Sequence, residues 1–227
     1  MAEDGSTSDT IARYSLENDS WAIMDPNGFN AFRPQPFSDT ELVQLAPNEA
    51  AIVQVTRAVS GSGPARFRVV KRTFDGDTLF AEEYGYRPVP IAAALVDSLI
   101  RDVGKSIEEL RRHFPRAPTP ARAEELARAS LYIPAHHPPV SNLVIGRDGT
   151  LWLRREDTGT GRVKWSLVSA EGEPLGTLEA PAGLRIMAAD RHTAWGLEKD
   201  ELDVPYIVRY RVVPLGQGTA GGRWITR

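Results

Sequence analysis

The sequence predicts a mainly β fold built from repeated four-stranded antiparallel units and interrupted by one helical segment. Three observations carry this prediction: an Asp-Gly turn between two apolar runs in the middle of the chain, a similar outline on both sides of it, and one stretch with helical periodicity. An Asp-Gly pair between apolar runs is a strong hairpin signal, because the turn needs a positive φ that Gly adopts without a Cβ clash.

The central unit covers residues 143–181. Asp148-Gly149 forms the expected turn between its first two strands, and the third strand alternates Val163, Trp165 and Leu167 with polar residues. This period of two is typical of a half-buried strand. The four expected strands are 143–145, 151–153, 162–168 and 175–178.

Weaker copies of this unit lie upstream at 42–84 and downstream at 184–213. The downstream copy repeats an apolar run, a turn centred on Asp190 and a strand that carries Trp195, in the place of Trp152. The spacing from Asp148 to Asp190 fits a propeller blade, which takes roughly 40–50 residues. The fold class predicted is therefore a partial β-propeller of about three to four antiparallel four-stranded blades with a helical insertion.

The helical insertion is expected at 91–133, between blades. Apolar residues recur there every three or four positions, which indicates amphipathic helices. Gly104 is expected to end one helix, and Ser106 with Glu109 forms a capping box that starts the next. Thr119 is expected to cap a third helix with Pro120 at its first position. Insertions between repeats often cover a binding face, so we expect specificity here.

The remaining segments complete the domain prediction. A hairpin at 20–32 is interpreted as the outer strands of an incomplete blade, and 33–37, with two prolines, as a linker. The predicted parts are a disordered N-terminus at 1–12, a partial propeller domain at 13–215 and a flexible Gly-rich tail at 216–227.

These motifs carry a family resemblance. The central turn with its LWLRR strand, then WGLEKDELDVPY and a closing RYR strand, resembles the C-terminal part of bacterial six-bladed β-propeller proteins, NHL-like in broad outline. The resemblance covers about 37–215 and implies an architecture, with no catalytic residues to transfer. Six blades need roughly 250–300 residues at this repeat length. The chain is therefore also interpreted as part of a longer exported protein, periplasmic or envelope-associated.

Composition narrows the function classes. Lys and Arg number 27 against 30 Asp and Glu, a net charge of −3, so no nucleic-acid partner is expected. The sequence has no Cys, which excludes disulfides and thiolate chemistry. No apolar run approaches the roughly 20 residues of a membrane span. We expect no signal peptide at residues 1–10, because this stretch is small, polar and acidic.

Few side chains suggest a site, and we predict no catalytic, cofactor or metal residue. His136 and His137 are adjacent in an extended Pro-flanked segment, so they point to opposite sides and suit a rigid connection better than a shared ion. The tryptophans could line a ligand channel, but their repetition favours packing between blades. The residues predicted to contact a ligand or partner are Arg147, Arg154, Arg155, His136, His137 and Trp152.

Three functional hypotheses follow. The first is a non-catalytic binding or scaffolding propeller for a protein or small ligand. The second is a metal-dependent hydrolase such as a lactonase, and its candidate oxygen ligands near blade starts are Glu41, Asn48, Asn142 and Asp190. The third is a gene fragment without independent function. Open blade faces associate unless they are covered, so a homodimer of two half-rings or poor solubility is expected.

Overall fold

The structure is a computed structural model. It describes residues 10–14, 19–46, 49–57, 64–155, 162–181, 183–214 and 222–226, the last five and 213–214 by backbone only. The chain forms two compact units, which are described separately. The β unit comprises Met1–Ser15, Glu41–Arg87 and Pro139–Arg227, and the helical unit comprises Leu16–Thr40 and Pro88–Pro138.

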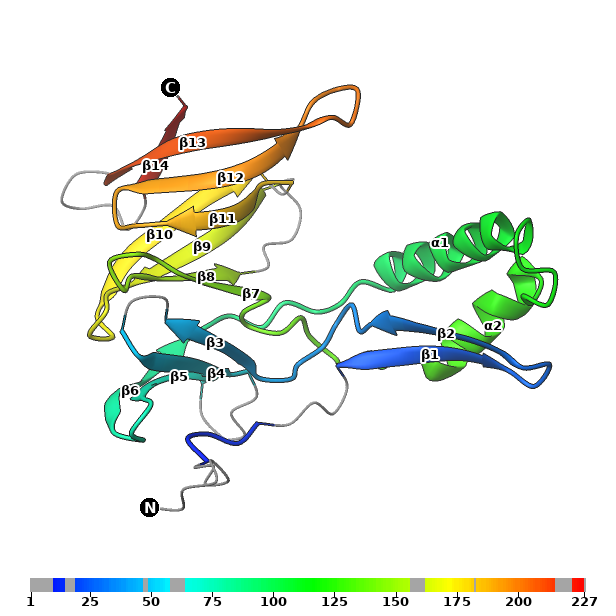
Figure 1. The fold of residues 1–227 in the computed structure, drawn as a ribbon, viewed down its shortest axis with the longest axis horizontal. Helices are drawn as coiled ribbons and strands as arrows, with labels where there is room; N and C mark the ends of the chain where they lie inside the picture. The colour runs from blue at the N-terminus through cyan, green and yellow to red at the C-terminus, as the bar shows by residue number, and fades with distance from the viewer. Residues whose placement is uncertain are drawn as a thin grey trace, which may run out of the picture. The chain divides into compact units, whose positions relative to one another are not determined.

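The β unit confirms the expectation of a mainly β fold, because it contains three antiparallel four-stranded meanders (Figure 1). The first two meanders match expected repeats, and the third takes its last strand from the segment predicted to be a tail. Meander 1 consists of β3 (Leu42–Ala46), β4 (Ala51–Thr56), β5 (Arg66–Thr73) and β6 (Thr78–Gly85). Meander 2 consists of β7 (Asn142–Ile145), β8 (Leu151–Arg155), β9 (Arg162–Val168) and β10 (Pro174–Pro181). Meander 3 consists of β11 (Arg185–Ala189), β12 (Thr193–Lys199), β13 (Pro205–Pro214) and β14 (Gly222–Thr226).

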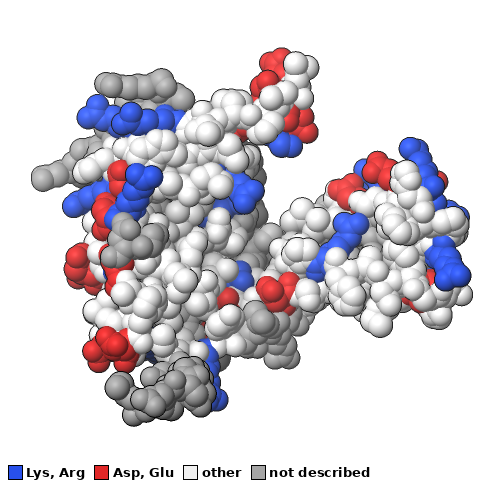
Figure 2. All heavy atoms as spheres, viewed as in Figure 1, with Lys and Arg blue, Asp and Glu red and all other residues white. Residues whose placement is uncertain are grey.

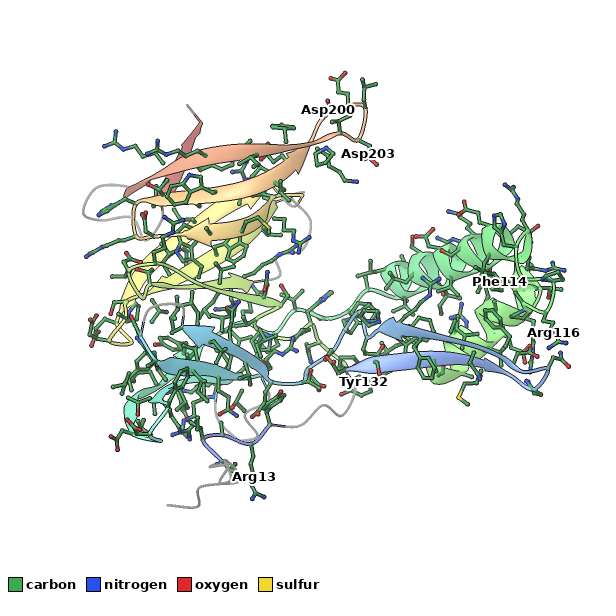
Figure 3. The ribbon with its side chains drawn as sticks, in the orientation of Figure 1. Arg13, Phe114, Arg116, Tyr132, Asp200 and Asp203 are labelled. Atoms are coloured by element: carbon green, nitrogen blue, oxygen red, sulfur yellow. The ribbon has the colours of Figure 1, made fainter. Side chains whose placement is uncertain are left out.

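Strand β14 corrects the prediction of a flexible tail at 216–227, of which 216–221 and 227 lie outside the described residues. It pairs antiparallel with β13 and, at Leu178 and Gly222, parallel with β10. Meanders 2 and 3 therefore share one eight-stranded sheet. The segment 1–12, predicted to be disordered, is described only from residue 10, and Arg13 (Figure 3) accepts a hydrogen bond from Gln54 Nε2 through its carbonyl, at 3.2 Å.

Two apolar cores hold the meanders together. In the first, Val53, Val55 and Phe67 of meander 1 pack with Leu151 and Leu153 of meander 2. The period of two sends the intervening residues of β8 to the opposite face of the sheet. In the second core, buried residues of β8 and β9 therefore pack against meander 3; they are Trp152, Val163, Trp165 and Leu167, opposite Ile186, Ala194, Val208, Tyr210 and Val212.

The first turns of neighbouring meanders are also joined by polar contacts. Strand β7 contacts both β3 and β11. Arg147 donates its backbone N–H to the Ala189 carbonyl at 2.9 Å, and Asp148 Oδ2 accepts the Arg191 N–H at 2.8 Å. Gly149 has the positive φ of +79° that the Asp-Gly turn predicted.

A buried lysine of meander 1 connects this meander to meander 2. Lys71 on β5 is only 3% exposed and pairs with Glu49, which follows β3. Its ammonium also donates to the carbonyl of Ala170, between β9 and β10, at 3.2 Å. Since a buried charge needs both a counter-charge and hydrogen bonds, this contact ties the two meanders at a defined point.

The helical unit combines a β-hairpin with two helices. Strands β1 (Ser20–Asp25) and β2 (Phe29–Pro34) pair antiparallel, and α1 (Ala93–Arg111) packs with α2 (Pro120–Ser130). Trp21, Ile23 and Phe37 share one core with buried residues of the helices. The hairpin, expected as part of a blade, packs on the helices instead, and β2 extends to Pro34 within the expected linker.

Two helices stand where three were expected. Thr119 caps α2, accepting the Arg122 N–H at 3.3 Å, with Pro120 at the first position as predicted. Gly104, however, lies inside a continuous α1, and Ser106 Oγ donates to the Asp102 carbonyl one turn back instead of capping a new helix. Gly104 is buried, and a Cβ there would meet the carboxylate end of Glu124 on α2. The flexible side chain of Glu124 therefore packs directly against this glycine.

Candidate functional site

Trp195 in meander 3 is less buried than Trp152, its counterpart in meander 2. Trp152 follows the pair Ile145–Leu151 on β8, and Trp195 follows the corresponding pair Ala189–Ala194 on β12. Trp152 is 0% exposed because meander 3 covers it, and it packs edge-on against Trp165. Trp195 occupies the same position on meander 3 and is only half-buried.

Two arginines lie over the Trp195 ring. The guanidinium carbon of Arg147, from the turn after β7, is 5.7 Å from the ring centroid, and that of Arg209 on β13 is 5.9 Å away. Arg209 is placed there by register, because it is the cross-strand partner of Trp195. Both distances are within the range of cation–π attraction, about 0.5–1 kcal/mol for exposed groups.

The same face carries further exposed apolar and basic side chains. Leu197 lies opposite Ile207, which is 78% exposed, and Met187, beside the β11 bulge, is 55% exposed. Figure 2 shows basic side chains over the region of β12 and β13. We call this surface the Trp195 face and define it by Arg147, Arg185, Met187, Trp195, Leu197, Ile207, Arg209 and Arg211.

The β12–β13 turn continues this surface with different chemistry. Leu202 is 82% exposed at its tip, where Asp200 and Asp203 also lie (Figure 3). The Asp200 carboxylate accepts the backbone N–H groups of Leu202 and Val204, both at 2.9 Å, and Lys199 bridges to Asp203 at 3.0 Å. These local bonds order the tip.

The arginines proposed from sequence are separated by the structure. Arg147 belongs to the Trp195 face. Arg154 and Arg155 lie on opposite faces of β8. Arg154 is the cross-strand partner of Trp165, on the side of meander 3. The guanidinium carbon of Arg155 lies 5.0 Å from the ring centroid of Phe67 and 5.8 Å from that of Tyr86, at meander 1. Burial lowers the pKa of Arg155, an effect that nearby Tyr86 opposes. Trp152 is in the core and presents no surface.

His136 and His137, the two histidines predicted to contact a ligand, lie in the helical unit. His136 forms an isolated bridge with Pro90, and the His137 N–H donates to the Val89 carbonyl at 2.8 Å. The His137 ring meets Phe37 edge-on at 5.8 Å. These contacts fit the expected rigid extended segment.

The candidate oxygen ligands of a hydrolase that the structure describes each accept hydrogen bonds from different groups. Glu41 accepts hydrogen bonds from Gln54 and Thr56, at 2.7 and 3.0 Å. Asn142 accepts the Leu143 N–H, and Asp190 accepts two N–H groups of its own turn. Asn48 lies outside the described residues. Within the described ranges, no three His, Asp or Glu side chains group to hold a metal ion.

Sequence reasoning missed Arg209 as part of a site. The signal was present, since 205–211 alternates in the pattern of a strand, but its register against β12 could not be read from the pattern. The partial exposure of Trp195 was hidden for a similar reason. Its sequence position matches that of the core residue Trp152, and only the packing of the third meander shows that Trp195 is less buried.

A comparison of the chain with protein-family models, curated proteins and solved structures finds no match. In the portion of the chain that the structure describes, neither helix has the length and apolar character needed to cross a bilayer.

Proposed function

We propose that this protein is a non-catalytic binding protein whose three meanders are successive blades of a partial β-propeller, and that the Trp195 face binds an acidic, partly apolar segment of a partner protein. The observation that carries this proposal is Trp195, only partly buried and flanked by two arginines at a position that is fully buried in the preceding meander. The similarity to NHL-like six-bladed propellers stays a prediction.

Three features support the assignment of blades. Each meander has the same strand order, and the first strands β3, β7 and β11 contact one another in sequence. The sheets pack face to face through alternating side chains, so each one buries two faces when it has neighbours on both sides. Propeller blades repeat in this manner around a centre.

The chemistry of the Trp195 face supports an acidic occupant. Arg185, Arg209 and Arg211 are exposed, and the described side chains of β11–β13 on this face include no Asp or Glu. An acidic partner would neutralise these charges, while Trp195, Leu197 and Ile207 would supply apolar burial. Tryptophan, tyrosine and arginine are enriched among the few residues that dominate binding energy in protein interfaces.

A defined peptide pair tests the proposal. The probe is a short synthetic peptide that alternates Glu and Val, and its control carries Lys in place of Glu. We expect the Glu peptide alone to bind, more tightly at low salt, because charge attraction is screened by ions. Trp195→Ala and Arg209→Glu should each weaken binding by at least about tenfold. Arg68→Glu, an exposed change on β5, should leave it unchanged.

Two results would overturn the acidic-partner proposal. One is equal binding of the Lys peptide, or binding that Arg209→Glu does not reduce. The other is a dimer in light scattering that Trp195→Ala converts to a monomer, since a second copy of this chain would then be the occupant.

A further inference from the structure

A cavity of about 370 Å³ lies in the helical unit, between the β1–β2 hairpin and α1. Its volume is within the range of small-molecule sites, about 300–1,000 Å³. All of its lining residues belong to the helical unit, so the cavity is independent of the Trp195 face.

The wall of the cavity is apolar and well fixed. Trp21, Ile100 and Val103 line it and belong to the buried core of the unit, and partly exposed Leu99 completes the wall. The Trp21 indole N–H donates to the Pro34 carbonyl at 3.1 Å. Because this donor is already used, the ring offers the cavity an apolar surface, and the body of a ligand must be apolar to fit.

The rim carries three polar side chains, two of which are engaged. Asp102 accepts a hydrogen bond from Lys105 Nζ at 2.9 Å, and Ser106 Oγ donates to the Asp102 carbonyl at 2.9 Å. Arg33 has no hydrogen bond or ion pair with the described residues. It is the cross-strand partner of Trp21, so the Arg33 side chain and the Trp21 indole share one face of the hairpin.

We propose that this cavity binds a small monocarboxylate with an apolar tail, its carboxylate on Arg33 and its tail against Trp21, Leu99 and Val103. A guanidinium matches a carboxylate through two parallel hydrogen bonds, and the Lys105 ammonium offsets the charge of Asp102. This proposal gives the helical unit a ligand of its own, and it does not depend on the function proposed for the β unit.

Octanoate tests this assignment, with octan-1-ol and octylamine as ligands of the same tail and different heads. We expect the indole N–H resonance of Trp21, identified from its loss in Trp21→Phe, to shift on titration with octanoate and not with octylamine. Arg33→Gln should weaken octanoate binding by about tenfold or more, and Arg33→Lys should weaken it less, because Lys keeps the charge without the paired donors.

Arg101→Gln is the matched control, since Arg101 is exposed on α1 and does not line the cavity. It should bind octanoate like the unchanged protein. The inference is overturned if the Trp21 resonance does not move, if octan-1-ol or octylamine binds as well as octanoate, or if a folded Arg33→Gln variant keeps full affinity. Circular dichroism establishes that each variant is folded.

Discussion

Replacing Glu49 by Gln should lower the free energy of unfolding of the β unit by about 2–3 kcal/mol. The change is nearly isosteric, so it removes the counter-charge of Lys71 and little else. Lys71 is 3% exposed, and its remaining described partner is the Ala170 carbonyl at 3.2 Å. The variant therefore leaves an ammonium buried between two meanders without a carboxylate.

The magnitude follows from the burial of the two partners. Removing one member of a buried ion pair typically costs about 3–5 kcal/mol. The Glu49 side chain is 29% exposed, so water reaches this end of the pair, and Gln still offers an oxygen to the ammonium. Both effects place the expected cost at or below the lower end of that range.

Urea unfolding followed by tryptophan fluorescence measures the loss, and Lys71→Met is the companion variant. Met removes the buried charge itself and fills a similar space, so it should cost less than Glu49→Gln. The double variant should be no less stable than Lys71→Met alone, which gives a coupling energy of at least about 2–3 kcal/mol. A Glu49→Gln variant within about 0.5 kcal/mol of the original protein, or additive losses in the double variant, would refute the reasoning.

Three further outcomes are expected. Gly149→Ala should cost about 2–3 kcal/mol in urea unfolding, because φ is +79° and the new Cβ would lie 2.8 Å from that of Ala170; a loss below about 0.5 kcal/mol would contradict this. Gly104→Ala should leave the free energy of unfolding unchanged or raise it by up to about 1 kcal/mol, since Ala favours a helix interior and the Glu124 carboxylate can move. A loss of stability would instead indicate that Gly104 ends a helix. Burial raises the pKa of the Tyr84 phenol to about 12. Because the unfolded value is about 10, the unfolded chain releases this proton first, and the stabilisation present below pH 10 should be lost as pH rises toward 12; absorbance titration at alkaline pH should lack this late component in Tyr84→Phe.

The repeated strands could be predicted because local chemistry specifies them. The expected strand 162–168 is β9 itself, and the turns at Asp75-Gly76 and Asp148-Gly149 have the positive φ that glycine permits. Alternation within β9 also identified Trp165 as a core residue. These features depend on neighbours in the chain, so the sequence pattern contains them.

The errors arose where distant segments decide the outcome. Gly104 resembles a helix end, but its role is set by Glu124 on another helix. Strand β14 follows a Gly-rich stretch and forms because β13 and β10 offer it partners. Arg154 and Arg155 are different, because the period of two in a strand already places adjacent side chains on opposite faces of β8. Pairing and packing over long separations were not available from composition or period.

The helical unit has a consequence for meander 1 that follows from chain connectivity. Its two segments, Leu16–Thr40 and Pro88–Pro138, bracket Glu41–Arg87, which contains all of meander 1. Tyr132 donates to Asp39 at 2.9 Å, and the stretch around His137 holds both Phe37 and Val89. Both ends of meander 1 are thus fastened to one short segment, which acts as a non-covalent cross-link. Such a closed loop has fewer unfolded conformations, so weakening the helical core should make meander 1 easier to unfold without altering any of its own contacts.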